Sequence, residues 1–230
     1  MTRAVLLDAL GVLLELEPPA PLLRAELAER GVAITEEEAT SALRAEIAYY
    51  RAHHDEASDP ARLEALRDRC AAVLDGALPA HARGIPDLRA ALLAGLRFRP
   101  YPEVPAALAA LRAAGLRLVV VSNWDVSLHA VLAETGLAPL VDAAISSAEC
   151  GAAKPDPAIF ARALALAGDV APAAAWHVGD TFEADVLGAR AAGIEPVLVL
   201  RDGTPAPSGV TVLHELRRLP ELAAAYLLSR

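Results

Sequence analysis

The residues most suited to chemistry are polar side chains that each follow a short apolar run of the chain. They are Asp8, Ser122, Lys154, Asp180 and Asp185. A carboxylate such as that of Asp8 can attack phosphorus and form an aspartyl-phosphate, which divides one difficult displacement into two easier ones. Further carboxylates beside the nucleophile suit Mg²⁺, which is a hard cation that prefers oxygen ligands. The set therefore predicts metal-assisted phosphoryl chemistry with Asp8 as the candidate nucleophile.

Lys154 is the only lysine of the chain, and the other 20 basic residues are arginines. An ammonium is a compact point charge, whereas a guanidinium is a planar fork, so a site that needs a small cation cannot accept the exchange. An isolated lysine could also reflect chance. Its place between an apolar run and an amphipathic helix, in Gly151-Ala-Ala-Lys154-Pro-Asp-Pro157, favours a functional role.

Short apolar runs separated by helical patterns indicate a parallel sheet. The runs are Ala4 to Leu7, Leu116 to Val121, Ala143 to Ser146, Ala175 to Val178 and Pro196 to Leu200. Helical patterns at Ser127 to Thr135 and Asp156 to Ala167 lie between them, and glycines at 115, 136, 168 and 193 are placed to end helices. This repetition predicts an α/β fold with a Rossmann-like, doubly wound sheet. Ligands of such sheets bind at the carboxyl ends of the strands, where the five polar residues fall.

The segment 16–98 breaks this alternation, because four helical patterns follow one another without a strand. They are Pro21 to Arg30, Glu36 to His54, Pro60 to Leu74 and Asp87 to Arg97, and prolines at 18, 19, 100 and 102 mark the two ends of the segment. We therefore expect a core domain of residues 1–15 and 99–230 with an inserted all-helical domain, 16–98.

The composition limits the classes of partner. A net charge of −9, with arginines spread among acidic residues, argues against nucleic acid and anionic membranes as partners. No apolar stretch reaches membrane-spanning length without charges. The two cysteines, Cys70 and Cys150, have no metal-like spacing and fit reduced thiols, so we expect a cytoplasmic protein. The oligomeric state is not indicated.

Four motifs in order resemble those of the haloacid dehalogenase superfamily of phosphatases and related hydrolases, and the helical insertion stands where that family carries its cap domain. The motifs begin at Asp8, at Ser122-Asn123, at Lys154 and at Gly179-Asp180. The resemblance implies that Asp8, the carbonyl of Leu10, Asp180 and Asp185 hold Mg²⁺. It also implies that Ser122, Asn123 and Lys154 bind a small-molecule phosphorylated substrate, and that Lys154 neutralises its charge and aligns Asp8.

One position departs from the pattern of the similar phosphatases. They usually carry a second aspartate two residues after the nucleophile, which protonates the leaving oxygen, and Leu10 stands there instead. A backbone carbonyl still suffices for the metal contact, so the change should remove proton transfer and spare Mg²⁺ binding. General acid catalysis contributes roughly 10²- to 10⁴-fold, so turnover could survive, best on acyl and aryl phosphates. Val12 replaces a common threonine, but its backbone amide can still meet a phosphoryl group.

Three other functions share part of this pattern. Dehalogenases release halide without a proton and also resemble the chain at Ser122-Asn123, but their last motif usually lacks the metal-binding aspartate kept here as Asp180. Phosphonatases need a cap lysine, which this chain does not have, and are excluded. A catalytically weak metal- and phosphate-binding regulator stays open because of Leu10.

Weaker signals lie outside these motifs. The cluster Tyr49, Tyr50, His53 and His54 places two aromatic–histidine pairs at helical i, i+4 spacing, either facing substrate or packing between helices. Asp125 is interpreted as a helix N-cap, although it could replace the missing acid. His177 is interpreted as packed in the fourth strand. A turn at 202–204 and a final helix at 220–228 complete the predictions.

Overall fold

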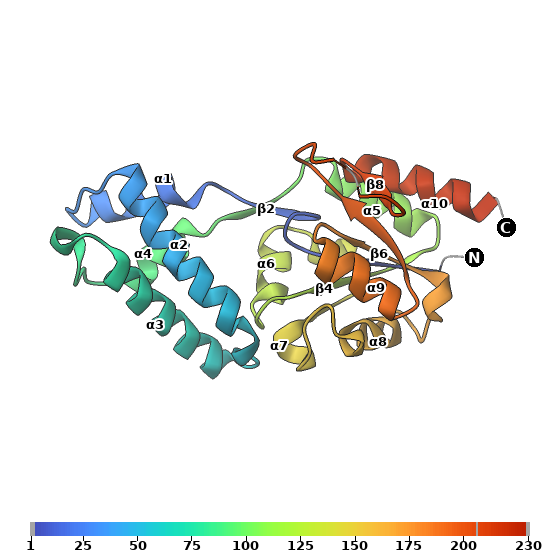
Figure 1. The fold of residues 1–230 in the computed structure, drawn as a ribbon, viewed down its shortest axis with the longest axis horizontal. Coiled ribbons are helices and arrows are strands. Elements are labelled where there is room, and N and C mark those ends of the chain that lie inside the picture. Colours follow the sequence, from blue (N-terminus) through green and yellow to red (C-terminus); the bar gives the residue numbers. More distant parts are fainter. Residues whose placement is uncertain (1–2, 206, 229–230) are drawn as a thin grey trace. The chain divides into compact units, whose positions relative to one another are not determined.

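The computed structural model describes residues 3–205 and 207–228, and it divides into two compact units. One unit comprises the segments Met1–Glu15 and Pro100–Arg230, and the other is Leu16–Arg99 (Figure 1). The division falls one residue from the boundary expected at 98/99.

The first unit is built on a six-stranded parallel sheet in the order β5-β4-β1-β6-β7-β8 (Figure 1). The strands are β1 Ala4–Leu7, β4 Arg117–Ser122, β5 Ala143–Ser146, β6 Ala175–Gly179, β7 Glu195–Val199 and β8 Thr211–Leu213. The predicted α/β class and the five predicted strands are confirmed, each within one residue at either end. The three-residue β8 was not predicted, because so short a run carries no measurable period.

The order of the strands in the six-stranded sheet indicates where a ligand can bind. From the central β1 the chain builds outward through β4 and β5, then crosses to the other side of β1 and continues with β6. In β1, Leu7 lies level with Val120 of β4 and with Val178 of β6, so these three strands end at the same edge. The order reverses at β1, and such a reversal opens a crevice at the carboxyl ends of the strands.

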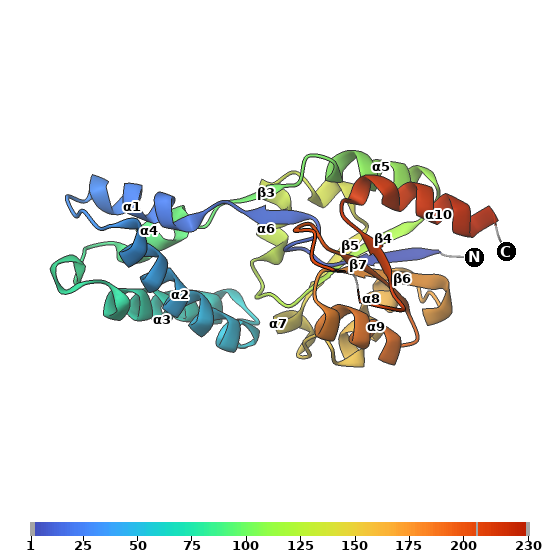
Figure 2. The ribbon, with the colours of Figure 1, turned by 45° about the horizontal axis from the view of Figure 1, so that its top comes forward.

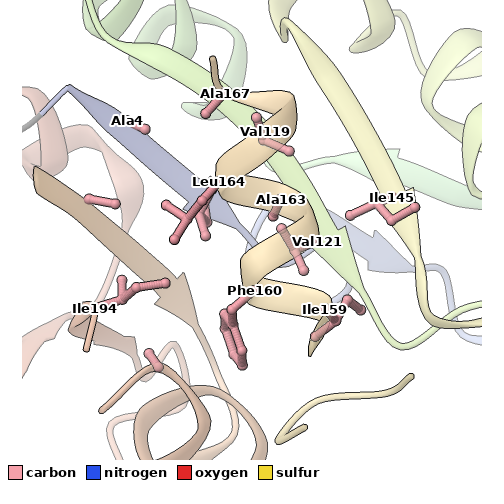
Figure 3. Packing of buried hydrophobic residues seen from close by; sticks show 13 residues of the cluster. Ala4, Val119, Val121, Ile145, Ile159, Phe160, Ala163, Leu164, Ala167 and Ile194 are labelled. Carbon is pink, nitrogen blue, oxygen red and sulfur yellow. The ribbon is translucent and has the colours of Figure 1, made fainter. Parts of the chain in front are cut away.

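Helices cover both faces of this sheet (Figure 2). On one face lie α5 Val104–Ala113 and α10 Leu219–Leu228, and on the other lie α8 Pro157–Leu166 and α9 Gly188–Ala191. From α8, the fully buried Phe160 and Ile159 pack with Val119 and Val121 of β4 (Figure 3). Each such side chain contributes roughly 1.5–3 kcal/mol by leaving water, so this packing fixes α8, and the loop before it, against the sheet.

Local caps set where the helices of this unit begin. The side chain of Asp156 accepts from the Ala158 amide at 2.8 Å, and Pro157 takes the first turn of α8. The helix after Ser122, α6 Leu128–Glu134, lies within one residue of the predicted range Ser127 to Thr135 at either end. The interpretation of Asp125 as the N-cap of a helix is wrong: its side chain accepts from the Ser127 amide at 2.6 Å and closes the turn that precedes the helix.

The second unit consists of four helices, as the sequence predicts. They are α1 Pro19–Glu29, α2 Glu36–His53, α3 Pro60–Ala77 and α4 Leu88–Gly95. A capping box between Thr35 and Glu38 starts α2, and Asp59 with Pro60 starts α3. The two-stranded sheet of β2 Leu14–Leu16 and β3 Phe98–Pro100 lies where the chain passes between the units. Neither of these two strands was predicted from the sequence.

The aromatic–histidine cluster forms as its spacing predicts. The rings of Tyr49 and His53 stack at 4.0 Å, and those of Tyr50 and His54 lie 5.7 Å apart. Arg69 of α3 donates to the Tyr49 hydroxyl at 3.0 Å. The cluster thus takes part in the contact between α2 and α3, which favours the packing interpretation.

Glu46 is a buried carboxylic acid in the helical unit, where only 3% of its surface is exposed. Burial raises its pKa above the ordinary value of 4.5, although a hydrogen bond with Cys70 opposes the rise. The folded state therefore binds the Glu46 proton more tightly than the unfolded chain. Its contribution to stability is complete below pH 4.5 and is lost as the pH rises through the folded-state pKa.

We expect Glu46→Gln to raise the free energy of unfolding increasingly from acidic to neutral pH, because glutamine has no charge to bury. Urea unfolding of the variant and the wild type between pH 4 and pH 8 measures this difference. The exposed Glu37→Gln is the control. A stabilisation by Glu46→Gln that is equal at all pH values would contradict the explanation.

Two further findings concern the chain as a whole. Cys70 and Cys150, both among the described residues, form no disulfide bond. None of the described helices is both long and apolar enough to cross a membrane.

Candidate active site

Asp8 directly follows β1 and holds one of its oxygens in a fixed position. Three donors converge on Oδ1: the Ala9 amide at 2.8 Å, the Ser122 hydroxyl at 2.7 Å and the Lys154 ammonium at 3.0 Å. Ser122 is the last residue of β4, which neighbours β1. These bonds lock the carboxylate plane and leave Oδ2 as the oxygen available for attack or for a cation.

Lys154 lies in the loop between the short helix α7 Ser147–Cys150 and α8, with 2% of its side chain exposed. Its ammonium lies 2.6 Å from Asp185 Oδ1 and 3.0 Å from Asp8 Oδ1. Burial alone would lower the pKa of Lys154, but the charges of Asp8 and Asp185 outweigh burial and raise it above the usual value. Lys154 is therefore a permanent positive charge between two carboxylates.

Asn123 holds the backbone of Lys154 at two points. Its side-chain oxygen accepts from the Lys154 amide at 2.7 Å, and its side-chain nitrogen donates to the Lys154 carbonyl at 2.9 Å. One amide group thus satisfies both polar groups of a loop residue 31 positions away. Because the amide is engaged in this way, a contact between the Asn123 side chain and a substrate would require this pair to break.

Asp185 lies in a π-helical turn, Phe182–Leu187, after β6 and is almost completely buried. Its Oδ1 receives Lys154 and the ring of His177, the latter at 2.8 Å, and its Oδ2 receives the Thr181 amide at 2.9 Å. Burial would raise the pKa of Asp185, but the Lys154 charge and the His177 hydrogen bond hold it far below its usual range. A side chain at Gly179 would collide with Asp185, so the glycine is required for this packing.

Asp180 brings a third carboxylate to the same place. Oxygens of Asp8, Asp180 and Asp185 lie within 4.8 Å of one another. Partial burial and the charges of Asp8 and Asp185 raise the pKa of Asp180 to about 6. Three carboxylates against the single ammonium of Lys154 leave excess negative charge, and this all-oxygen donor set fits a hard divalent cation.

The turn after Asp8 brings the backbone close to Asp180. Gly11 has a φ of 80°, and a Cβ there would lie 1.9 Å from Asp180 Oδ2, so only glycine permits the approach. The Gly11 amide donates to the Leu14 carbonyl at 2.8 Å. Leu10 is one of two large apolar side chains that are exposed among the described residues. No titratable group therefore stands two residues after Asp8.

The structure brings together all five polar residues predicted from the strand ends. Asn123, the sixth predicted residue, bonds to the backbone of Lys154. His177 was interpreted as packed, and it is fully buried against Phe160, with ring centroids 5.0 Å apart. Its second role, the hydrogen bond to Asp185, was missed. The sequence signal that could have indicated this bond is the presence of a polar residue, His177, inside the apolar run Ala175 to Val178. No pattern in the sequence indicated a role for Arg201.

A doubly wound sheet with a carboxylate cluster and a buried lysine at its switch point defines a class of hydrolases. The sequence model of the haloacid dehalogenase-like hydrolase family matches residues 2–193, and the chain belongs to this family. The family resemblance noted in the sequence is thereby confirmed.

The similar proteins include both phosphatases and dehalogenases. The chain is 45% identical over 94 residues to "Haloacid dehalogenase-like hydrolase domain-containing protein 3" of Bos taurus, covering 41% of this chain and 37% of that protein. It is 42% identical over 110 residues to a phosphoserine phosphatase of Thermus thermophilus, covering 47% and 44%. The matches thus span less than half of either relative.

Among solved structures, the 2-haloacid dehalogenase of Pseudomonas syringae pv. Tomato has a TM-score of 0.68 at 26% identity, covering 98% of this chain and 100% of that chain. The L-2-haloacid dehalogenase of Xanthobacter autotrophicus has a TM-score of 0.70 at 25% identity, covering 97% and 99%.

Proposed function

We propose that the protein is a Mg²⁺-dependent cytoplasmic phosphatase that hydrolyses a small phosphorylated metabolite through an aspartyl-phosphate on Asp8. In this proposal residues 16–98 have the cap role that the family resemblance implies. The observation that carries the chemistry is the cluster of three carboxylates around one buried lysine. Halide release needs no such donor set, whereas phosphoryl transfer benefits from a cation and an ammonium beside the transferred charge.

In the first step Asp8 Oδ2 would attack phosphorus and the bond to the leaving oxygen would break. The three donors on Oδ1 support this assignment, because they hold the carboxylate in one orientation and leave the other oxygen to react. In the second step water would attack the same phosphorus and release Asp8. Lys154 and the Ser122 hydroxyl would stabilise the phosphoryl oxygens throughout.

Asp8, Asp180, Asp185 and the Leu10 carbonyl would hold Mg²⁺, with Asp185 binding directly or through water. When bound, Mg²⁺ would neutralise the charge that the phosphoryl group and these carboxylates bring together. His177 and the Thr181 amide would keep the Asp185 carboxylate oriented for this role.

The test is phosphate release from a panel of acyl, aryl and alkyl phosphates, each measured with Mg²⁺ and with a chelator. We expect turnover that requires Mg²⁺ and that falls as the leaving group becomes a poorer one, since Leu10 cannot protonate it. The absence of Mg²⁺-dependent turnover on every member of the panel would overturn the proposal.

Leu10→Asp should restore the missing acid. We expect a gain of roughly 10²-fold or more in kcat on alkyl phosphates and little change on acyl phosphates, whose leaving groups need no proton. Leu10→Asn, which is isosteric with aspartate but cannot transfer a proton, is the matched control. An equal gain with both variants would show that polarity at this position, and not proton transfer, is the cause.

Halide release is a second candidate, favoured by one specific observation: the departing halide needs no acid at the exposed Leu10. Asp8 would attack carbon, and water would then hydrolyse the ester. A 2-chloroacid added to the panel tests this candidate. Chloride release that requires Asp8 and is insensitive to the chelator would support dehalogenation, and no release would exclude it for this substrate.

A further inference from the structure

Arg201 follows β7 and contacts two segments, 11–12 and 101–103, that are distant in sequence but lie in the same unit. Its Nε donates to the Gly11 carbonyl at 3.0 Å, and Nη2 donates to the Val12 carbonyl at 2.8 Å. Nη1 donates to Glu103 at 2.8 Å, and the guanidinium lies 3.4 Å from the centroid of the Tyr101 ring. All three nitrogens of the guanidinium are thus engaged, two of them by consecutive carbonyls of the turn after Asp8.

This contact sets the direction of a backbone amide. A trans peptide is planar, with its N–H antiparallel to its C=O. The Gly11 carbonyl points at Arg201, so the N–H of the same peptide, which belongs to Val12, points away from Arg201. Val12 is completely buried, yet in the described part of the chain its amide donates no hydrogen bond. A buried donor without a partner is costly, which is explained if a ligand completes it.

The other side of the same turn faces the carboxylate cluster. Gly11 lies so close to Asp180 that no Cβ fits between them, and its own amide is held by Leu14. Leu13 and Leu14 both donate to the Ala9 carbonyl at 2.8 Å, which closes the turn on itself. From outside the turn, the Tyr101 amide donates to the Leu13 carbonyl at 3.1 Å, and Arg201 binds the two preceding carbonyls, those of Gly11 and Val12.

We propose that Arg201 is a positioning residue for the phosphoryl site: it orients the Gly11–Val12 peptide so that the Val12 amide is presented to a phosphoryl oxygen. The inference rests on the proposed function. It assigns to Arg201 no contact with substrate, because its donors are occupied by protein groups. Arg201 acts on the substrate indirectly, by fixing the orientation of the Gly11–Val12 peptide.

The geometry requires arginine. Only a guanidinium offers donors in a rigid fork that can reach two carbonyls and a carboxylate at once while stacking on a ring. Lysine at this position would keep the charge and could reach one of these acceptors at a time. Arg201→Lys therefore separates the orienting role from the charge.

The experiment compares Arg201→Lys and Arg201→Gln with Arg112→Gln as the matched control. Arg112 also donates to a backbone carbonyl, that of Pro139, and lies near a carboxylate, that of Asp142. Three quantities are measured on each full-length protein: the exchange rate of the Val12 amide by NMR, the affinity for inorganic phosphate with Mg²⁺, and kcat and KM on the best substrate of the panel.

We expect both Arg201 variants to remain folded, to exchange the Val12 amide at least about tenfold faster and to bind phosphate about tenfold more weakly. We expect kcat to fall roughly 10- to 100-fold, since the donor is misplaced by a fraction of an ångström. Arg112→Gln should change none of these. If both Arg201 variants failed to fold while Arg112→Gln folded, Arg201 would be a structural residue and the inference would be wrong.

Two outcomes distinguish this inference from the proposed function. If the wild type hydrolyses no phosphate and binds none, the proposed function fails, and the phosphate part of the inference fails with it, whatever the amide shows. If the wild type is active but the Arg201 variants keep the wild-type Val12 exchange rate or the wild-type phosphate affinity, only the positioning role of Arg201 is overturned.

Discussion

Asp8→Asn is expected to abolish Mg²⁺-dependent phosphate release, with a loss of at least about 10⁴-fold in kcat, because an amide oxygen is a poor nucleophile and cannot form the acyl-phosphate. The fold should survive, since asparagine keeps the size of the side chain and an oxygen to accept from Ala9 and Ser122. Initial rates across the phosphate panel measure the loss. Intact-mass analysis of quenched turnover measures the phosphorylated protein, which should form with the wild type alone.

The matched control for this change is Asp142→Asn. Asp142 precedes β5 at the opposite edge of the same sheet, where it accepts from the Leu118 amide at 2.8 Å and pairs with Arg117. Its replacement makes the same chemical change to a carboxylate that is remote from the cluster, so kcat should be retained. Residual turnover by Asp8→Asn within tenfold of the wild type would rule out Asp8 as nucleophile.

Lys154→Met should produce the second large effect, on turnover and stability together. Removing a buried cation leaves Asp8 and Asp185 without their shared partner, and breaking a buried ion pair typically costs about 3–5 kcal/mol. We expect the free energy of unfolding to fall by about that amount, and kcat to fall by roughly 10³-fold because charge stabilisation is lost. Urea unfolding and the phosphate assay measure the two effects.

A double variant separates these two effects. Lys154→Met combined with Asp185→Asn removes one of the carboxylates that the first change leaves unpaired, so part of the stability should return while turnover stays lost. Coupling between neighbours in one network is what a double-mutant cycle detects. Strictly additive losses of stability would mean that the 2.6 Å contact between Lys154 and Asp185 contributes nothing measurable.

Much of this architecture could be predicted because its signals are local. Buried parallel strands are short apolar runs bounded by breakers, and Asp156-Pro157 marks the start of α8 by its own chemistry. The helical unit was visible as four consecutive helical periods without a strand. The one lysine among many arginines drew attention to the position that the structure buries between two carboxylates.

The predictions that failed concern short or non-local features. The strands β2, β3 and β8 have three residues each, too few for a period to appear. The role of Asp125 was wrongly predicted, because its side chain closes a turn as readily as it would cap a helix. That Asn123 binds substrate stays a prediction, but its two-point hold on Lys154 was not predicted, because it depends on a loop that lies far along the chain.

By itself, the sequence determined which residue types are present and at which strand ends they stand, and this was enough for the fold class, the family and the candidate nucleophile. Tertiary structure alone decided which oxygen of Asp8 is held and which is left to react. It also decided that His177 hydrogen-bonds to Asp185, and that Arg201 donates to the carbonyl of Val12, 189 residues away. The physical reason is that hydrogen-bond direction and the sharing of charge depend on distances between segments that no local pattern encodes.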